Sequence, residues 1–402
     1  MARAGHPRPQ MTLEALARRS IEISRASQAS SGAYPASPTL PVYRFAWLRD
    51  GAFVADAMSR WGEAESAEAF FSWCAQIVGR YESRIQELVR RDAEGKPLAP
   101  GDFLPVRFTL DGHETHDGWW NFQLDSYGAW LWALGAHADR GRLHTPAARY
   151  APAVAATARY LLAFWDRACY SCWEENPEYV HVPTLAAIAA GLRSAADWPH
   201  VSPRLRARSG ETVSSIERLV RAEGTQNGRL VRWLGGQELD AALVFCSVPY
   251  GLFKPDEPLM RSTVTAIERE LAHPEGGVHR YLADEFYGGG EWIILAAALG
   301  LYKLALGDTE AAWRRLEWIA DQADADGQLP EQSDTHLLHP ERLAEWVDRW
   351  GTAARPLLWS HAMFLTLFGE AHVQGPCFSD PPRARPPADH PPGAGLGNPA
   401  GR

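Results

Sequence analysis

Residues 292–306, WIILAAALGLYKLAL, form the most apolar run in the chain. The run is shorter than the roughly 20 residues that a membrane span needs, and Lys303 interrupts it. A segment of this length that is apolar on nearly every side is typical of a helix inside a large core. Residues 359–368 have the same character. The sequence therefore predicts helices that are buried all around.

The segment from Glu63 to Arg91 has a different character. Its apolar residues recur at steps of three and four, which is the spacing of one face of an α-helix, and its other face is strongly charged. We predict one long amphipathic helix here. Two concentric layers of helices account for both kinds of helix, because inner helices are covered on all sides and outer helices on one.

Helical patterns continue along most of the chain, and with the three segments above they give about a dozen helices. The other candidates are Thr12–Ser27, Asp50–Arg60, Leu124–Leu134, Ala147–Asp166, Pro183–Ala196, Glu211–Glu223, Glu238–Phe245, Leu259–Leu271, Thr309–Ala323 and Pro340–Trp350. No short repeat of fixed period is visible, which disfavours a regular solenoid. The sequence predicts an all-α protein.

Composition and charge exclude several classes of function. The chain has 402 residues, of which 46% are hydrophobic and 22% charged, as expected for a globular protein with a large core. A formal net charge of -9 argues against nucleic-acid binding, which depends on clustered Lys and Arg. The amino terminus has no apolar region of a secretory signal. We expect a cytoplasmic protein with no membrane or nucleic-acid partner.

The cysteines form neither a disulfide framework nor a metal site. Their number is five, and an odd number favours reduced thiols. Cys169 and Cys172 have CxxC spacing, but neither a second pair nor a suitably spaced His completes a zinc site. We predict no metal and no cofactor. Residues 375–402 are dense in Pro and Gly and poor in large apolar residues, so we predict a disordered tail there.

Aromatic and charged residues crowd the loops between the predicted helices. Residues 43–50, YRFAWLRD, place Arg49 and Asp50 beside aromatic side chains just ahead of a helix. Capping of that helix by Asp50, with Arg49 paired to it, explains this segment equally well. Residues 117–125, DGWWNFQLD, again put Trp side chains, amides and a carboxylate at the start of a helix, where a structural role is also open.

Two further loops supply carboxylates. Residues 172–176, CWEEN, contain Glu174 and Glu175, and residues 329–334, LPEQSD, contain Glu331. Hydrolysis of a glycosidic bond needs one carboxyl group that protonates the departing oxygen; an inverting enzyme uses a second to activate water. Glu174 and Glu331 are far apart in the sequence, so only the fold can bring them together.

The motifs resemble those of glycoside hydrolase family 15, the glucoamylases and their bacterial relatives, across nearly all of residues 11–370. Five motifs follow the family's order: Tyr43-x-x-x-Trp47-x-Arg49-Asp50, Trp119 to Asp125, Trp173-Glu174-Glu175, Arg280-Tyr281 with Tyr287 to Trp292, and Glu331-Gln332 with Leu358-Trp359-Ser360. The resemblance implies an (α/α)6 barrel, with six inner helices inside six outer ones. It also implies an inverting, exo-acting α-glucosidase whose catalytic domain is residues 1–374.

The resemblance assigns a role to each matching residue. Glu174 matches the general acid and Glu331 the general base. The residues that match substrate contacts are Tyr43, Trp47, Arg49, Asp50, Trp119, Glu175 and Arg280. We expect burial and nearby carboxylates to keep Glu174 protonated near neutral pH, whereas Glu331 has to stay ionised and hold a water.

The chain also departs from the family pattern. Many members have an Asp two places before the motif Trp, where this chain has Ser171, which leaves any role of that Asp open. A starch-binding module and a long amino-terminal β-sandwich are not found. In its size the chain resembles the small isomaltose glucohydrolases of the family, and this resemblance implies release of β-glucose from isomaltose or short α-1,6-linked gluco-oligosaccharides.

Other activities share parts of this pattern. A trehalase or an α-1,4-glucan glucohydrolase would use the same acid and base and differ in how the leaving sugar is held. An inverting sugar phosphorylase also uses a helical barrel, but phosphate replaces water there and no basic carboxylate is needed. A non-catalytic helical toroid has no reason to keep both carboxylates. The presence of Glu331 favours hydrolysis.

Overall fold

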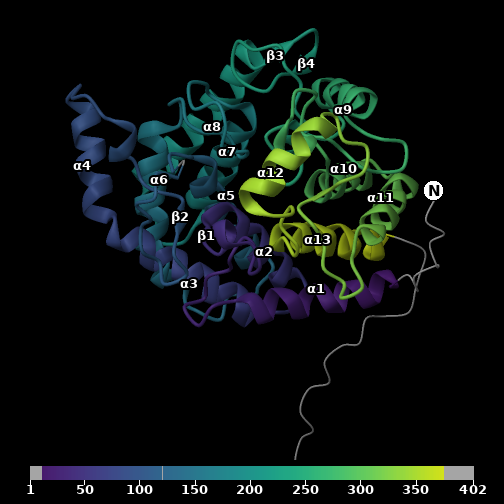
Figure 1. Cartoon of the computed structure of the whole chain (residues 1–402). Coiled ribbons are helices and arrows are strands. Elements are labelled where there is room, and N and C mark those ends of the chain that lie inside the picture. The colour runs from purple at the N-terminus through teal and green to yellow at the C-terminus, as the bar shows by residue number, and fades with distance from the viewer. Residues whose placement is uncertain (1–10, 120, 375–402) are drawn as a thin grey trace, which may run out of the picture.

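The computed structural model describes residues 11–119 and 121–374, and most of these residues are helical (Figure 1). Six helical segments form a closed inner ring in which each contacts the next and the last contacts the first. In ring order they are α2 (Leu48–Arg60), α5 (Asp125–Asp139), α7 (Val182–Asp197), the 3-10 helix η4 (Ala241–Cys246), α10 (Ile293–Ala305) and α13 (Leu358–Gln374). The predicted tail, residues 375–402, lies outside the described residues.

A second set of helices packs against the outside of this ring. Along the chain these helices alternate with the inner ones: α1 (Leu13–Ser27), α3 (Ala64–Arg80), α6 (Ala151–Phe164), α8 (Pro203–Glu223), α9 (Pro258–Glu270) and α11 (Thr309–Asp321). The described part of the chain is thus an (α/α)6 barrel, as predicted. Among the described residues, no helix is both long enough and apolar enough to cross a membrane.

Burial separates the two layers in the way that the sequence patterns predict. Helix α2 buries 12 of its 13 residues and α10 buries 10 of 13, whereas α8 buries four of 21. Inner helices approach one another closely where glycines meet. A Cβ built on Gly128 of α5 would lie 2.3 Å from the carbonyl oxygen of Ala187 in α7, so a side chain there would push the two helices apart.

Several predicted helices differ from those observed. The segment Glu63–Arg91 is two helices, α3 and α4 (Glu82–Ala93), separated at Tyr81, where ψ is 3°. The amphipathic pattern runs through the bend because α3 buries its apolar face against α2 and α4 buries its face against α6. In Figure 1, α4 extends away from the ring at one edge of the molecule.

The predicted helix Glu238–Phe245 is instead the short 3-10 helix η4. Its start is fixed by Asp240, whose side chain accepts a hydrogen bond from the backbone N–H of Ala242, and Pro249 follows its end. Helix α8 starts at Pro203, eight residues before the predicted Glu211, because Ser202 caps it and Pro203 occupies its first turn.

Three pairs of short strands, together with α4 and one further helix, lie in the connections that lead from outer to inner helices. The strand pairs are β1 (Ala46–Trp47) with β2 (Arg107–Phe108), β3 (Thr225–Gln226) with β4 (Arg229–Leu230), and β5 (Glu291–Trp292) with β6 (Gln332–Ser333), all antiparallel. Helix α12 (Leu343–Trp350) lies in the connection between α11 and α13. The loops that lead from outer to inner helices carry the motifs singled out in the sequence.

Candidate active site

All residues that the sequence assigns to the site line one cavity of about 380 Å³. A cavity of this size is within the range of small-molecule sites, which is about 300 to 1,000 Å³. Several of its residues stand at the start of an inner helix: Trp47 precedes α2 and Trp292 precedes α10. The barrel therefore brings motifs from distant parts of the sequence to one place.

Glu174 stands on a tight turn with an unusual backbone. Its φ is 62°, in the left-handed region that is rare for residues other than glycine. Ser171 organises this turn: its carbonyl accepts from the N–H of Glu174, and its buried hydroxyl accepts from the N–H of Trp173 at 3.2 Å. Ser171 thus contributes to the site by holding the backbone that carries Glu174.

Three side chains donate hydrogen bonds to the carboxyl group of Glu174. The indole N–H of Trp47 and the amide of Gln123 both donate to Oε1, at 2.7 and 2.6 Å. The indole N–H of Trp119 donates to Oε2 at 2.8 Å. Burial nevertheless raises the pKa of Glu174 above its ordinary value, against the opposing effects of Arg49 and of these donors.

Glu331 has a sparser environment. The hydroxyl of Tyr43 donates to its Oε1 at 3.0 Å, and among the described residues no group donates to its Oε2. Burial raises the pKa of Glu331 to about 8, although the hydrogen bond from Tyr43 and the charge of Arg280 lower it. The protein groups alone therefore favour the protonated form at neutral pH, whereas the sequence analysis expects an ionised Glu331.

The two carboxyl groups are connected through a pair of aromatic residues. Tyr43 contacts Glu331 and Trp47 contacts Glu174, and the rings of Tyr43 and Trp47 meet edge to face with centroids 5.9 Å apart. Both groups also line the same cavity. The fold therefore brings together Glu174 and Glu331, which the sequence separates widely.

Arg49 and Asp50 are fixed by a buried network at the start of α2. Arg49 donates to Gln123 at 2.7 Å and to Asp125 at 3.2 Å, and it lies 3.4 Å from Asp50. Gln123 in turn contacts Glu174, so the second motif supports both the arginine and the first carboxyl group. Burial raises the pKa of Asp50 to about 6, with Arg49 opposing this effect.

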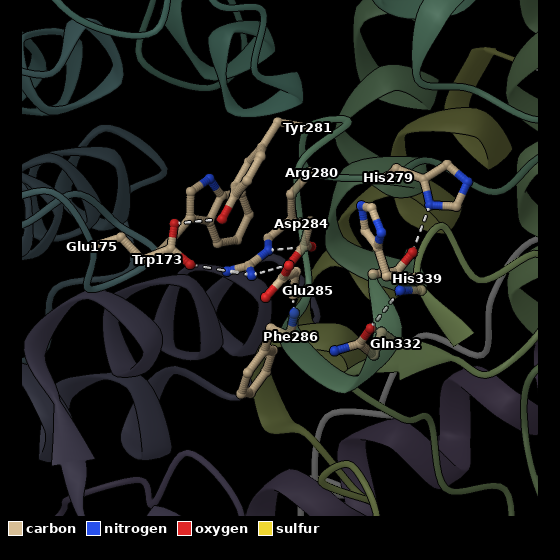
Figure 2. A network of polar contacts seen from close by, with 12 residues as sticks. Trp173, Glu175, His279, Arg280, Tyr281, Asp284, Glu285, Phe286, Gln332 and His339 are labelled. Atoms are coloured by element: carbon tan, nitrogen blue, oxygen red, sulfur yellow. Dashed lines mark hydrogen bonds and ion pairs between the residues drawn. The ribbon is translucent and has the colours of Figure 1, made fainter. Parts of the chain in front are cut away.

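Arg280 is held between two carboxylates, those of Asp284 and Glu175 (Figure 2). It donates to Asp284 through Nε at 2.6 Å and Nη2 at 2.5 Å, and Nη2 lies 3.3 Å from Glu175. Glu175 also accepts from Tyr281 at 2.6 Å and from Arg232 at 2.7 Å. Although burial opposes it, the nearby Arg280 and Arg232 and the Tyr281 hydrogen bond hold the pKa of Glu175 below its ordinary value.

The cavity has an aromatic wall that the motifs do not identify. Helix α12 contributes Trp346 and Trp350, and the ring of Trp350 stacks on that of Trp119 with centroids 6.1 Å apart. The two residues are four positions apart on a helix with no buried residue. This spacing of two Trp residues was the signal in the sequence that could have identified them. Other lining residues outside the predicted set include Trp173, Tyr281, Glu285, Phe286, Trp292 and Trp359.

The described cysteines are free thiols, as expected from their number. Cys169 is buried and Cys172 lies at the cavity wall. Within the described residues, the group that could hold a metal ion contains no cysteine and no residue that lines this cavity.

Comparison with known proteins gives consistent results. Isomaltose glucohydrolase from Kribbella flavida is 46% identical over 370 residues, which cover 92% of this chain and 95% of that protein. A solved glycosidase variant in complex with glucose is also 46% identical, with a TM-score of 0.86, over 89% of this chain and 96% of that one. A bacterial glucoamylase in complex with acarbose shares the fold at 20% identity, with a TM-score of 0.71 over 88% of this chain and 55% of that one.

The family model of glycosyl hydrolases family 15 matches residues 10–369, a range that includes every residue of the cavity described above. The match thus covers both the helical barrel and the carboxyl groups that it brings together. The chain is a glycoside hydrolase and belongs to glycosyl hydrolases family 15.

Proposed function

We propose that the chain is an inverting, exo-acting α-glucosidase that releases β-glucose from the non-reducing end of isomaltose or short α-1,6-linked gluco-oligosaccharides. The observation that carries the proposal is the cavity of about 380 Å³, in which the partly buried Glu174 and the buried Glu331 have different hydrogen-bond partners. The similarity to isomaltose glucohydrolase over almost the whole chain supports the choice of substrate.

Glu174 is proposed to act as the general acid. Among the described residues, two side chains donate to its Oε1 and one donates to its Oε2, so Oε2 keeps a lone pair that can carry the proton. Burial favours the protonated form. Oε2 would then donate this proton to the glycosidic oxygen as the bond to the leaving sugar breaks.

Glu331 is proposed to act as the general base. Its Oε2 has no protein donor among the described residues, so it can accept a hydrogen bond from the attacking water. We expect a separation of about 6.5 to 9.5 Å between the two carboxyl groups, the distance that leaves room for water in inverting enzymes. The transition state carries positive charge on the sugar ring, which nearby carboxylates favour.

The remaining polar groups are proposed to bind the terminal glucose. Arg49 and Asp50 present a fixed cation and carboxyl group at one side of the cavity, and Arg280 presents a second fixed cation. The indole N–H groups of Trp292 and Trp359 have no partner among the described residues and line the same cavity. They can therefore donate to sugar hydroxyls.

The aromatic wall is proposed to hold the leaving sugar. Trp119 contacts both Glu174 and Trp350, so it stands between the acid and the wall formed by α12. Flat aromatic rings stack on the apolar faces of sugars. With this wall on one side, the cavity is proposed to admit the end of a chain in preference to the middle of a polymer.

Substrate choice is tested by comparing kcat/KM for isomaltose, maltose and trehalose, with and without phosphate. We expect isomaltose to be preferred and phosphate to have no effect. A preference for maltose or trehalose would indicate one of the related activities. A strict requirement for phosphate would indicate a phosphorylase, and inactivity on all three sugars would favour a non-catalytic toroid.

The two carboxyl roles are tested with Glu174→Gln and Glu331→Gln. Each should reduce the hydrolysis of isomaltose by about 10² to 10⁴-fold, because each removes a proton transfer. On α-glucosyl fluoride, whose leaving group needs no proton, Glu174→Gln should recover much of its activity and Glu331→Gln should not. Glu285→Gln, at a half-exposed lining position, is the matched control. Proton NMR should detect β-glucose as the first product, and initial α-glucose would contradict inversion.

We also propose that residues 1–374 form one catalytic domain and that the protein is cytoplasmic. The closed inner ring, which α13 completes by packing on α2, supports a single domain. The free thiols of the four described cysteines support a reducing compartment. A chain ending at Gln374 should retain its kcat/KM and its melting temperature, and fractionation of cells should place the protein with the cytoplasmic enzymes.

A further inference from the structure

Three side chains from separate segments lie close together at the β5–β6 pair, and none of them lines the cavity. His273 follows α9, Glu291 belongs to β5, and His336 follows β6. Each offers one possible ligand atom, and these atoms all lie within 4.8 Å of one another. The group was not expected from the sequence, because its members are widely separated and form no recognisable spacing.

The carboxylate of Glu291 is fully buried, yet it has little to neutralise it. Among the described residues its ion-pair partner is His336, whose Nδ1 lies 3.3 Å from both carboxylate oxygens, and the hydroxyl of Thr335 donates a long hydrogen bond of 3.4 Å to Oε2. The chain leaves room for this group: a Cβ built on Gly277 would be 2.2 Å from Cδ of Glu291. A buried carboxylate is costly unless a cation or several hydrogen bonds compensate it.

The two imidazole rings are arranged as a pair beside this carboxylate. His273 and His336 stack with centroids 3.7 Å apart and an interplanar angle of 21°. His336 has a φ of 51°, so its backbone is held in the left-handed region. A tetrahedral ion with bonds of about 2.0 to 2.1 Å places its ligand atoms about 3.3 Å apart, which matches the contact between His336 and Glu291.

A second carboxylate lies next to both rings. The Oε2 atom of Glu275 is 3.9 Å from Nδ1 of His273 and 3.9 Å from Nε2 of His336. Because its side chain is exposed, Glu275 can rotate to complete a four-ligand set or leave the fourth position to water. Two imidazoles with one or two carboxylates are ligands that suit Zn²⁺ or a similar transition metal better than Mg²⁺ or Ca²⁺.

We propose that His273, Glu291 and His336 form a binding site for a divalent transition metal of the Zn²⁺ class. The ion would join β5 to the segment after β6. In this ladder Glu291 pairs with Ser333 and Trp292 pairs with Gln332, and the residue before Gln332 is Glu331. The site is therefore structural: it holds the two strands that position Trp292 and Glu331, and it takes no part in the hydrolysis.

Binding is tested on untagged protein from which metals have been removed by a chelator. Titration with Zn²⁺ in a calorimeter should show one equivalent bound, and Co²⁺ should give the visible absorption of a low-coordinate site. His336→Ala and His273→Ala should each weaken binding by at least about tenfold. His113→Ala, which removes an exposed histidine outside the group, should bind as the unchanged chain does.

Thermal unfolding provides an independent readout that does not depend on activity. Zn²⁺ should raise the melting temperature of the unchanged chain and of His113→Ala, and leave that of His336→Ala unchanged, because a ligand that binds only the folded state stabilises it. Circular dichroism of the metal-free variants verifies that they are folded. Equal Zn²⁺ affinity in His336→Ala and the unchanged chain would overturn the proposal. Failure of the unchanged chain to bind Zn²⁺ stoichiometrically would also overturn it, and the three residues would then be a hydrogen-bonded group without a metal.

Discussion

At the scale of single residues, Glu174 and Glu331 differ mainly in the groups that donate hydrogen bonds to them. Tyr43→Phe removes the donor that lowers the pKa of Glu331, so Glu331 should keep its proton up to a higher pH. The acidic limb of the profile of kcat/KM against pH reports the general base, Glu331, and should move to higher pH. Trp47→Phe removes a donor that lowers the pKa of Glu174. The alkaline limb, which reports the general acid, should then move to higher pH.

The paired variants provide their own control, because each should shift a different limb of the same profile. The measurement is kcat/KM for isomaltose from acidic to alkaline pH in the unchanged chain and both variants. Equal shifts of both limbs in Tyr43→Phe would contradict the separate assignment of the two carboxyl groups.

Trp119 combines two functions in one side chain, because it donates to Glu174 and stacks on Trp350. Trp119→Ala should raise KM and lower kcat together, since both the stacking surface and the indole donor are lost. An aromatic contact of about 1.5 kcal/mol corresponds to about tenfold in kcat/KM. Trp119→Phe keeps the ring and should recover KM but not kcat. Recovery of both by Phe would show that the indole N–H is unimportant.

The motifs predicted which residues line the cavity, because each contains a rare combination of Trp, Arg and carboxylate. They did not predict Trp346 and Trp350, whose spacing is also common in helices that pack against a core. Arg232 was missed because its partner Glu175 is far away in the sequence. Hydrogen-bond partners depend on rotamers and distances that only the folded chain defines.

At the scale of helices, the crossing of α5 and α7 depends on the absence of side chains. Gly128→Ala would place a Cβ 2.3 Å from a backbone oxygen of α7, which cannot move aside as a flexible side chain could. We expect a loss of about 3 kcal/mol in the free energy of unfolding. Gly79→Ala in α3 is the matched control, because nothing lies within 4 Å of its Cβ. It should stabilise by up to about 1 kcal/mol. Unfolding by denaturant measures the free energy of unfolding of both variants. Equal changes in Gly128→Ala and Gly79→Ala would contradict a role of close helix contact at Gly128.

The periodicity of apolar residues predicted most helices, but it could not predict where a helix bends or tightens. The pattern continues through Tyr81 because both α3 and α4 have one apolar face, although these faces meet different helices. Residues 238–245 have enough apolar residues for an α-helix, yet the chain forms η4 because Asp240 fixes its start. Contacts with neighbouring elements determine where a helix bends and whether it adopts 3-10 geometry.

At the scale of the whole molecule, the carboxyl pair lies in a cavity of about 380 Å³, a volume at the small end of the range for small-molecule sites. We therefore expect kcat/KM to be high for isomaltose, to stop rising beyond short oligosaccharides, and to be low for soluble starch. Initial rates of glucose release across a series of α-1,6-linked oligosaccharides measure this. Rapid release from starch with isomaltose left nearly untouched would contradict the proposed substrate, though not the family.

The ring of inner helices also has one segment unlike the others. Five positions are α-helices of 13 to 17 residues, and the sixth is η4, with six residues in the weaker 3-10 geometry. Amide hydrogens of η4 should therefore exchange with deuterated water sooner than those of α5 or α7, through local opening of the barrel.

The N–H of Ala241 donates to the carbonyl of Arg280, so this opening loosens a residue of the cavity. By linkage, glucose in the cavity should slow exchange in η4, although no residue of η4 lines that cavity. Mass spectrometry of exchanged peptides measures this slowing; unchanged exchange in η4 at saturating glucose would show that the barrel does not respond to its substrate.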